Sequence, residues 1–168
     1  MAEAPSASQV YRELAPRVLG YLRAQRVPDP EDVLGEVFLQ VARDIHRFKG
    51  DDADLRRWVF SIPHNRVIDD RRLRARRPQT SDVDVPEAAS PAEPDPFDPT
   101  LVEALAGLSP DQREVVVLRF VGDLPLEVVA RLTGRKVGAV KALQHRALAN
   151  LARAVSPEGA PTLTESDD

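Results

Sequence analysis

A proline-rich acidic segment in the middle of the chain limits the fold to two separate pieces. Residues 78–99 contain 6 of the chain's 15 prolines and 6 Asp and Glu, without any Lys or Arg. Such a segment buries too little apolar area to offset the entropy lost on folding, and its like charges repel one another. We therefore expect a flexible linker at 78–99, small domains at 1–77 and 100–155, and a disordered tail at 156–168.

Charge is distributed unevenly along the chain. The formal net charge of −4 argues by itself against a polyanionic partner. However, residues 1–77 hold 15 Lys and Arg against 12 Asp and Glu, and residues 100–155 hold 8 against 5. The tail has 4 acidic residues and no basic ones. The acidity is thus confined to segments expected to be unfolded, which leaves two basic domains.

The composition disfavours several classes of protein and site. Without cysteine there is no disulfide framework or thiolate metal site, and the 3 His residues show no ligand spacing. No apolar run approaches the roughly 18 to 20 residues that span a bilayer, and the N-terminus lacks the features of a signal peptide. We expect a cytoplasmic protein without metal, cofactor or membrane insertion.

The spacing of apolar residues predicts helices in both domains and no strands, so the fold class is all-α. Proline marks some of the helix starts, because Asp29 and Ser109 each precede a proline and are expected to cap the following helix. Pro16 is expected to kink the first helix or delay its start, and Pro63 to kink the third helix or divide it in two. The predicted helices cover residues 11–22, 30–48, 55–77, 101–108, 110–119, 126–132 and 137–151.

Two basic constellations indicate a nucleic-acid partner. In residues 126–148, a short apolar helix, a turn at Gly134 and a second amphipathic helix form a helix-turn-helix pattern, which would place the second helix in a major groove. In residues 65–77, crowded guanidinium groups repel one another unless an anion compensates. An ordinary helical hairpin and a solvated basic helix end stay open as alternatives. The crowded arginines are Arg66, Arg71, Arg72, Arg74, Arg76 and Arg77.

The acidic clusters do not indicate catalysis. Residues 29–36 place four carboxylates in the first turns of a helix, where they interact favourably with the macrodipole. The acidic loop at 51–54 lacks the spacing of a calcium site. Phe38 and Trp58 fall at expected core positions. No glycine-rich phosphate loop or pair of nucleophile and base is present, so we expect no enzyme activity.

Two motif sets follow one another along the chain. The first comprises DPEDVLGEVFL at 29–39, FKG at 48–50, RWV at 57–59, and Asn65 and Asp69 with Arg71 and Arg72. The second comprises LSPDQREV at 108–115, VGAVK at 137–141 and HRA at 145–147. With these motifs in this order, the chain resembles the extracytoplasmic-function (ECF) class of bacterial sigma factors over about residues 11–77 and 102–155.

The resemblance implies a promoter-specificity subunit with sigma region 2 at 1–77 and sigma region 4 at 100–155. Its implied partners are core RNA polymerase, through the β′ clamp helices and the β flap, promoter DNA and an anti-sigma factor. The implied polymerase-binding residues are Asp29, Asp32, Val33, Glu36, Val37, Leu39 and Gln40. Those implied to melt and read the minus-10 element are Phe48, Lys49, Gly50, Asp51, Asp52, Asn65, Arg66, Asp69 and Arg72. Those implied to read the minus-35 element are Arg135, Lys136, Val137, Gly138, Ala139, Lys141, Ala142, His145 and Arg146.

The sequence departs from the family pattern at several of these positions. Pro63-His64 stands where Ala-Arg is usual, Gly35 where Gln is common, Arg135-Lys136 in place of Ile-Ser, and residues 142–144 in place of Ser-Arg-Leu. Promoter preference is therefore not carried over from relatives. The alternatives are a stand-alone helix-turn-helix regulator whose N-terminal domain senses a ligand or dimerises, and a helical adaptor or enzyme with an unrecognised site.

Overall fold

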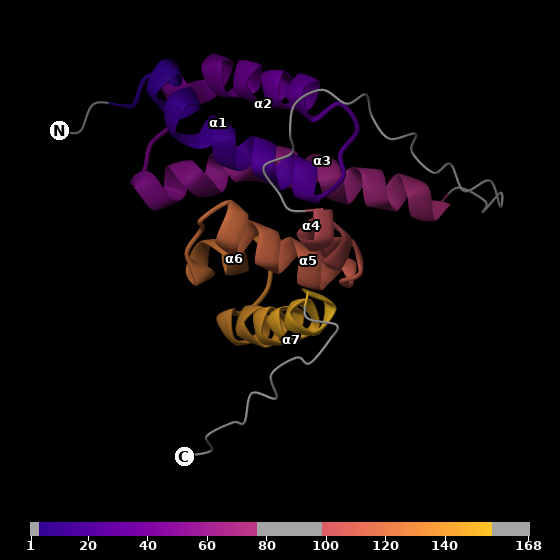
Figure 1. Ribbon diagram of the computed structural model, residues 1–168. Coiled ribbons are helices and arrows are strands. Elements are labelled where there is room, and N and C mark those ends of the chain that lie inside the picture. The colour runs from indigo at the N-terminus through magenta and orange to yellow at the C-terminus, as the bar shows by residue number, and fades with distance from the viewer. Residues whose placement is uncertain (1–3, 77–98, 156–168) are drawn as a thin grey trace. The chain divides into compact units, whose positions relative to one another are not determined.

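The computed structural model describes residues 4–76 and 99–155, and all regular elements in these ranges are helical (Figure 1). This confirms the predicted all-α fold class. The chain divides into two compact units, Met1–Asp95 and Pro96–Asp168, called unit 1 and unit 2 below. The segments predicted to be linker and tail lie outside the described residues, except Pro99.

The described part of unit 1, residues 4–76, consists of three helices and one short turn of 3₁₀ helix. The helices are α1 (Ala7–Ala24), α2 (Pro30–Asp44) and α3 (Asp52–Arg76), and the 3₁₀ turn η1 (Ile45–Arg47) follows α2. Each helix packs against the other two, because apolar residues three or four positions apart share one helix face. The largest fully buried side chains of this core are Tyr21, Phe60, Leu14, Leu22, Val10, Val18, Val37, Val41 and Val59.

Two prolines lie inside helices without dividing them. Pro16 lies within α1, which begins at Ala7 after a capping box between Ser6 and Gln9. Helix α3 runs continuously through Pro63, so the expected alternative of two abutting helices at this point is wrong. Val59, Phe60 and Val67 are buried on either side of Pro63. The packing of these residues offsets the loss of the backbone hydrogen bond that a proline nitrogen cannot donate.

Helix α2 begins differently from the expectation. Pro30 is its first residue, as predicted, but Asp29 has φ +51° and its side chain makes no capping hydrogen bond. The expected side-chain cap is therefore wrong, because a left-handed backbone replaces the extended one that a capping residue adopts. Glu31, in the first turn, binds Arg23 of α1 with 2.9 Å between Oε1 and Nη2. This hydrogen bond from Arg23 lowers the pKa of the Glu31 carboxyl.

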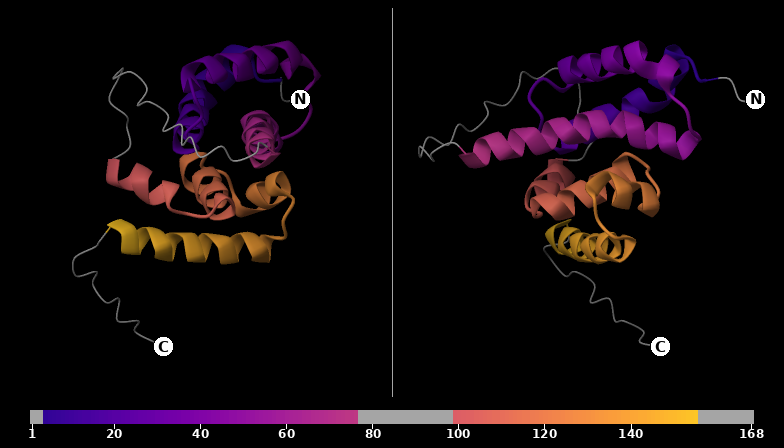
Figure 2. Two further views of the ribbon diagram at one scale, coloured as in Figure 1. Left: turned by 90° about the vertical axis from the view of Figure 1, so that its right-hand side faces the viewer. Right: turned by 180° about the vertical axis from the view of Figure 1, so that it is seen from behind.

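Over residues 99–155, unit 2 contains four α-helices and one π-helical segment. These are α4 (Pro99–Ala106), α5 (Pro110–Val116), the π-helical segment η2 (Val117–Val121), α6 (Leu126–Thr133) and α7 (Val137–Val155). Figure 2 shows α7 running along one side of α4, α5 and α6, and α7 contacts all three. The core of unit 2 includes Leu105, Val115, Val117, Leu118, Leu124, Val129, Val140 and Ala147.

The junction between α4 and α5 is held by side chains of α5. Ser109 caps α5 as predicted, because its Oγ accepts a hydrogen bond from the Gln112 amide at 3.2 Å. Arg113 donates from Nε to the Leu105 carbonyl at 3.0 Å and from Nη2 to the Leu108 carbonyl at 3.1 Å. The Leu105 carbonyl also accepts a hydrogen bond from the Leu108 amide at 3.1 Å, so Arg113 reinforces the turn that follows α4 and ties it to α5.

Candidate nucleic-acid interface

Gly134 sets the turn between α6 and α7. It has φ +69°, its amide donates to the Arg131 carbonyl at 3.4 Å, and the Arg135 amide donates to the Ala130 carbonyl at 2.9 Å. This pair of bonds ends a helix and is favoured by glycine, which adopts positive φ without steric cost. Since α7 begins only three residues later, at Val137, the two helices form the predicted helix-turn-helix.

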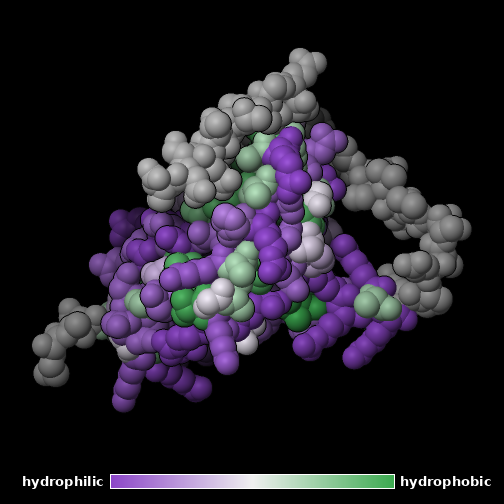
Figure 3. Space-filling view, turned by 90° about the horizontal axis from the view of Figure 1, so that it is seen from below, coloured by the Kyte–Doolittle hydropathy of each residue, from purple (hydrophilic) through white to green (hydrophobic). Residues whose placement is uncertain are grey.

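The exposed face of α7 carries most of the residues assigned to the minus-35 element. Val140 and Ala147 are fully buried, and a rotation of about 100° per residue turns the assigned positions away from them. Val137 and Ala142 are half-buried, so they border this face. Figure 3 looks onto the side of unit 2 that carries α7, and hydrophilic side chains project from most of the surface shown. The exposed assigned residues are Arg135, Lys136, Gly138, Ala139, Lys141, His145 and Arg146.

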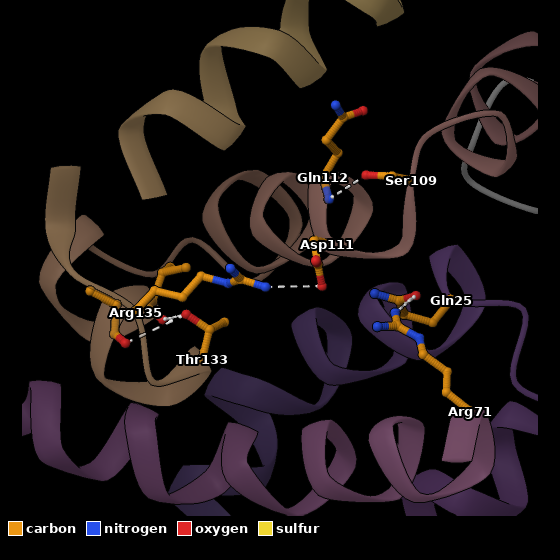
Figure 4. Close-up of polar contacts among 9 residues, drawn as sticks. Gln25, Arg71, Ser109, Asp111, Gln112, Thr133 and Arg135 are labelled. Atoms are coloured by element: carbon orange, nitrogen blue, oxygen red, sulfur yellow. Dashed lines mark hydrogen bonds and ion pairs between the residues drawn. The ribbon is translucent and has the colours of Figure 1, made fainter. Parts of the chain in front are cut away.

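Side chains of α5 hold α7 at two places. Asp111 forms an ion pair with Arg135, with 3.0 Å between Oδ1 and Nη2 (Figure 4). Further along α7, Asn150 donates from Nδ2 to Oε1 of Gln112 at 3.2 Å. Thr133 also binds back to the Val129 carbonyl at 2.8 Å, which tightens the end of α6. The start of α7, called the reading helix below because the minus-35 element is assigned to it, is thus fixed by the turn at Gly134 and by α5.

In unit 1, an aromatic pair borders an open pocket beside η1. The rings of Phe48 and Trp58 are stacked, with centroids 5.7 Å apart and 18° between their planes. Trp58 is only partly buried, so the expectation that it is a core residue is wrong, because its ring packs on Phe48 at the surface. The pocket measures about 440 Å³ and is lined by Asp44, Arg47, Phe48, Lys49, Asp54, Arg57 and Trp58.

The acidic residues assigned to the minus-10 element are already engaged at the start of α3. The Asp54 amide donates to Oδ1 of Asp51 at 2.9 Å, and the Asp51 amide donates to Oδ2 of Asp54 at 3.1 Å. Asp52 forms an ion pair with Arg56 at 3.0 Å. These carboxylates therefore stabilise the helix start, although Asp51 and Asp52 are exposed.

The remaining minus-10 candidates lie along one side of α3. Asn65, Arg66, Asp69 and Arg72 are all exposed. Spacings of three, four and seven residues place Asn65, Asp69 and Arg72 on one helix face, and Arg66 lies at the edge of that face. Arg66 forms an ion pair with Glu36 of α2, which joins the minus-10 candidates to the polymerase-binding candidates. The basic end of α3 continues through Arg76, and Arg77 lies outside the described residues.

The polymerase-binding candidates divide into an exposed and a buried group. Val33 and Val37 are 4% and 2% exposed, so their side chains belong to the core of unit 1, and their assignment to polymerase binding stays a prediction. They pack α2 against its neighbours because they fall on its apolar face. Leu39 is 65% exposed, and its neighbours three and four positions away on the outer face of α2 are Gly35, Glu36, Ala42 and Arg43, all exposed. The exposed candidates are Asp29, Asp32, Glu36, Leu39 and Gln40.

The described residues form neither a metal-binding cluster nor a membrane-spanning helix. Within residues 4–76 and 99–155, no three His, Cys, Asp or Glu side chains gather in a way that would hold a metal ion. The helices described there all fall short of the length or apolar character needed to cross a membrane. His64 is buried, whereas His46 and His145 are exposed.

Family comparisons match the same two parts of the chain. The family model for Sigma-70 region 2 matches residues 10–77, and the one for Sigma-70, region 4 matches residues 100–151. The ECF RNA polymerase sigma factor ShbA of Streptomyces griseus is 30% identical over 168 residues, which cover 89% of this chain and 87% of ShbA. This chain belongs to the ECF sigma factors.

Further relatives of this sigma factor agree with that assignment. The RNA polymerase sigma factor CarQ of Myxococcus xanthus is 35% identical over 141 residues, or 79% of each chain. The ECF sigma factor BldN of Streptomyces coelicolor is 33% identical over 152 residues, which cover 86% of this chain but only 55% of BldN. The predicted family is confirmed, and with it the expected function, since sigma factors are initiation factors that direct RNA polymerase to promoters.

Solved structures show the same fold. The sigma factor RpoE of Bartonella quintana, in complex with the anti-sigma factor NepR, superimposes with a TM-score of 0.70 at 24% identity and covers 88% of this chain and 95% of RpoE. CnrH, in complex with the cytosolic domain of CnrY, gives a TM-score of 0.62 at 21% identity and covers 90% and 88%. At this level of identity the likeness concerns the fold alone.

The sequence reasoning missed the residues that position the reading helix of this sigma factor. Asp111 and Gln112 were recognised only as part of the motif at 108–115, and Asn150 was not named, yet they tie α5 to Arg135 and to α7. Asp111 lies in α5 and Arg135 in the turn between α6 and α7, so they are not related by any helical period. No local pattern therefore signals their contact, and only the packing of α5 against α7 brings them together.

Proposed function

We propose that unit 1 binds core RNA polymerase and the melted minus-10 element, while unit 2 reads the minus-35 element with α7. The observation that supports this most strongly is the helix-turn-helix of unit 2, in which Lys141, His145 and Arg146 are exposed opposite the buried Val140 and Ala147. Such a helix can enter the major groove with its polar side chains directed at phosphates and base edges.

For the minus-10 element, the pocket beside η1 is the proposed site of an extruded base. Phe48 and Trp58 provide a stacking surface at its wall, and Lys49 and Arg57 supply positive charge for the backbone. Stacking on aromatic rings together with charge along the strand is the usual way to hold single-stranded DNA. Asn65 and Asp69 on α3 then offer exposed polar groups to further unpaired bases.

For the polymerase, the outer face of α2 is the proposed contact. Leu39 presents apolar area on this face, which also carries the exposed Asp32, Glu36 and Gln40. An apolar residue within a polar rim is typical of protein interfaces. We infer that this face binds the β′ clamp helices. Family resemblance alone supports the further proposal that unit 2 contacts the β flap.

The remaining proposals concern an inhibitory partner and location. RpoE of B. quintana has been solved with an anti-sigma factor, and we propose that an anti-sigma factor also controls this chain. We further propose that the chain works in the cytoplasm, where RNA polymerase and the chromosome are found. An anti-sigma factor that covered α2 would compete directly with the polymerase.

Run-off transcription with purified core polymerase and a library of genomic fragments tests the proposed function. We expect initiation from a subset of fragments only when the chain is added. Asn65→Ala and Asp69→Ala should reduce promoter opening, measured by permanganate reactivity of unpaired thymines, while duplex binding by the holoenzyme is retained. If both variants open promoters normally, while Lys141→Ala abolishes opening, the proposed minus-10 role of α3 is wrong.

A stand-alone regulator would behave differently. It would bind an operator duplex tightly without polymerase, and it would not co-purify with the core enzyme. Tight binding of the isolated chain to one duplex, combined with no affinity for core polymerase, would overturn the proposal.

A further inference from the structure

Asp111 lies beside the start of the reading helix, where it is the counter-ion of Arg135. We propose that Asp111 is a specificity-determining residue: it restrains Arg135 and opposes sequence-independent attraction of DNA to the start of α7. This inference rests on the proposed role of α7 at the minus-35 element. According to this proposal, a residue of α5, outside α7 itself, influences how strongly duplex binding depends on DNA sequence.

The geometry restrains Arg135 at both its backbone and its side chain. The backbone is held in the turn by the hydrogen bond from the Arg135 amide to the Ala130 carbonyl. The Arg135 side chain points toward α5, where its Nη2 lies 3.0 Å from Oδ1 of Asp111 (Figure 4). A guanidinium group has five N–H donors. A single bond to Asp111 therefore leaves capacity for a phosphate or a guanine edge.

The electrostatics explain why a carboxylate matters at this place. Arg135 and Lys136 precede α7 directly, and the first turn of α7 contains no acidic residue. The positive end of the helix macrodipole adds to these two charges. Phosphates of any sequence are attracted to such a site, because backbone contacts carry no sequence information. Asp111 counteracts this attraction and leaves base contacts to decide where the helix binds.

The pair is a restraint that DNA can displace. The side chain of Arg135 is 36% exposed and that of Asp111 is 61% exposed. Solvent and salt therefore screen their attraction, and exchange of Asp111 for a phosphate involves little desolvation. The Asp111 carboxylate then competes with every phosphate that approaches Arg135. This competition lowers the affinity for DNA most on duplexes that lack the base contacts of the minus-35 element.

The test uses the full chain in holoenzyme with core polymerase. Binding is measured to a labelled promoter duplex identified by run-off transcription, and to the same duplex with a scrambled minus-35 element, over a range of salt concentrations. Asp111→Asn keeps the size of the side chain and removes its charge. We expect about two- to fivefold tighter binding to the scrambled duplex, and a smaller ratio between promoter and scrambled affinities. The slope of log K against log salt should steepen by up to about one unit.

Two controls separate a specific effect from a general change in charge. In an Arg135→Gln background, Asp111→Asn should have a smaller effect on the ratio and the slope, because only Lys136 and the helix macrodipole remain for Asp111 to counteract. Glu127→Gln removes another exposed acidic charge from the first turn of a helix, α6, and should leave both quantities unchanged. Equal effects of Asp111→Asn with and without Arg135, or equal effects of the Glu127 variant, would overturn the inference.

Lys141→Ala distinguishes failure of this inference from failure of the proposed function. If Lys141→Ala weakens promoter binding while Asp111→Asn changes neither ratio nor slope, only the role of Asp111 is wrong. If Lys141→Ala and Arg135→Gln both leave promoter binding unchanged, α7 does not read the minus-35 element, and both proposals fail.

Discussion

At the scale of single residues, Gly50 is the position where a methyl group should do most harm. Its φ is +150°, and an added Cβ would lie 2.7 Å from Cβ and 2.8 Å from Oδ2 of Asp54. Gly50→Ala therefore strains the backbone and displaces Asp54 from its hydrogen bonds with Asp51. We predict a loss of roughly 1–3 kcal/mol in the free energy of unfolding. Urea denaturation followed by fluorescence of the single tryptophan, Trp58, measures this in unit 1.

Gly35→Ala is the matched control for that prediction. Gly35 lies within α2 and is exposed, and an added Cβ would meet nothing within 4 Å. Alanine restricts the unfolded chain more than glycine does, so this variant should be more stable by about 0.5–1 kcal/mol. Equal destabilisation by both substitutions would show that Gly50 is not under the strain described.

The ion pair between Arg23 and Glu31 predicts a small pH dependence of stability. Because the hydrogen bond from Arg23 lowers the pKa of Glu31 below its ordinary value of 4.5, acidification protonates this carboxyl in the unfolded chain first. The stabilisation is therefore present above pH 4.5 and is lost as the pH falls through the lowered pKa of the folded state. Wild type should exceed Glu31→Gln in urea midpoint near neutral pH and match it in acid. A difference that persists unchanged in acid would contradict this.

At the scale of elements, the exposed face of α7 predicts the salt dependence of DNA binding. Arg146 is exposed on this face, and a phosphate contact releases condensed counterions from the duplex. Arg146→Ala should weaken holoenzyme binding to promoter and scrambled duplexes alike, and should reduce the slope of log K against log salt by about one unit. Arg12→Ala, at an exposed position of α1, is the control and should change neither. An unchanged slope for Arg146→Ala would exclude a phosphate contact there.

The helices themselves were largely predictable, and the misjudged details have physical causes. Apolar spacing located α2 because Val33, Val37 and Val41 fall on one face, and the same face is buried. The continuity of α3 through Pro63 was not predictable, because packing of Phe60 and Val67 decides it. Local rules give the cost of an interior proline but not the tertiary contacts that offset it.

At the scale of the whole molecule, the division into two units predicts that transcription initiation requires a covalent connection between them. If each unit binds a separate site on the promoter complex, the covalent connection raises the effective concentration of the second unit to about millimolar. We predict that a protease site inserted between Ala89 and Ser90 is tolerated in run-off transcription, and that cleavage at micromolar concentrations abolishes most of the product. The uncut protein, incubated with inactivated protease, is the control. Full activity after cleavage would show that the connection is unnecessary.

The sequence by itself determined the all-α class, the helix-turn-helix and the family. Apolar period, proline, glycine and charge act over a few residues, and the motif sets stand in linear order. Tertiary structure alone decided which assigned residues are available to a partner. It buried Val33 and Val37, stacked Trp58 on Phe48 beside a pocket, and joined Asp111 to Arg135. These outcomes depend on contacts between helices, and helical periodicity specifies the face of a helix without specifying what that face meets.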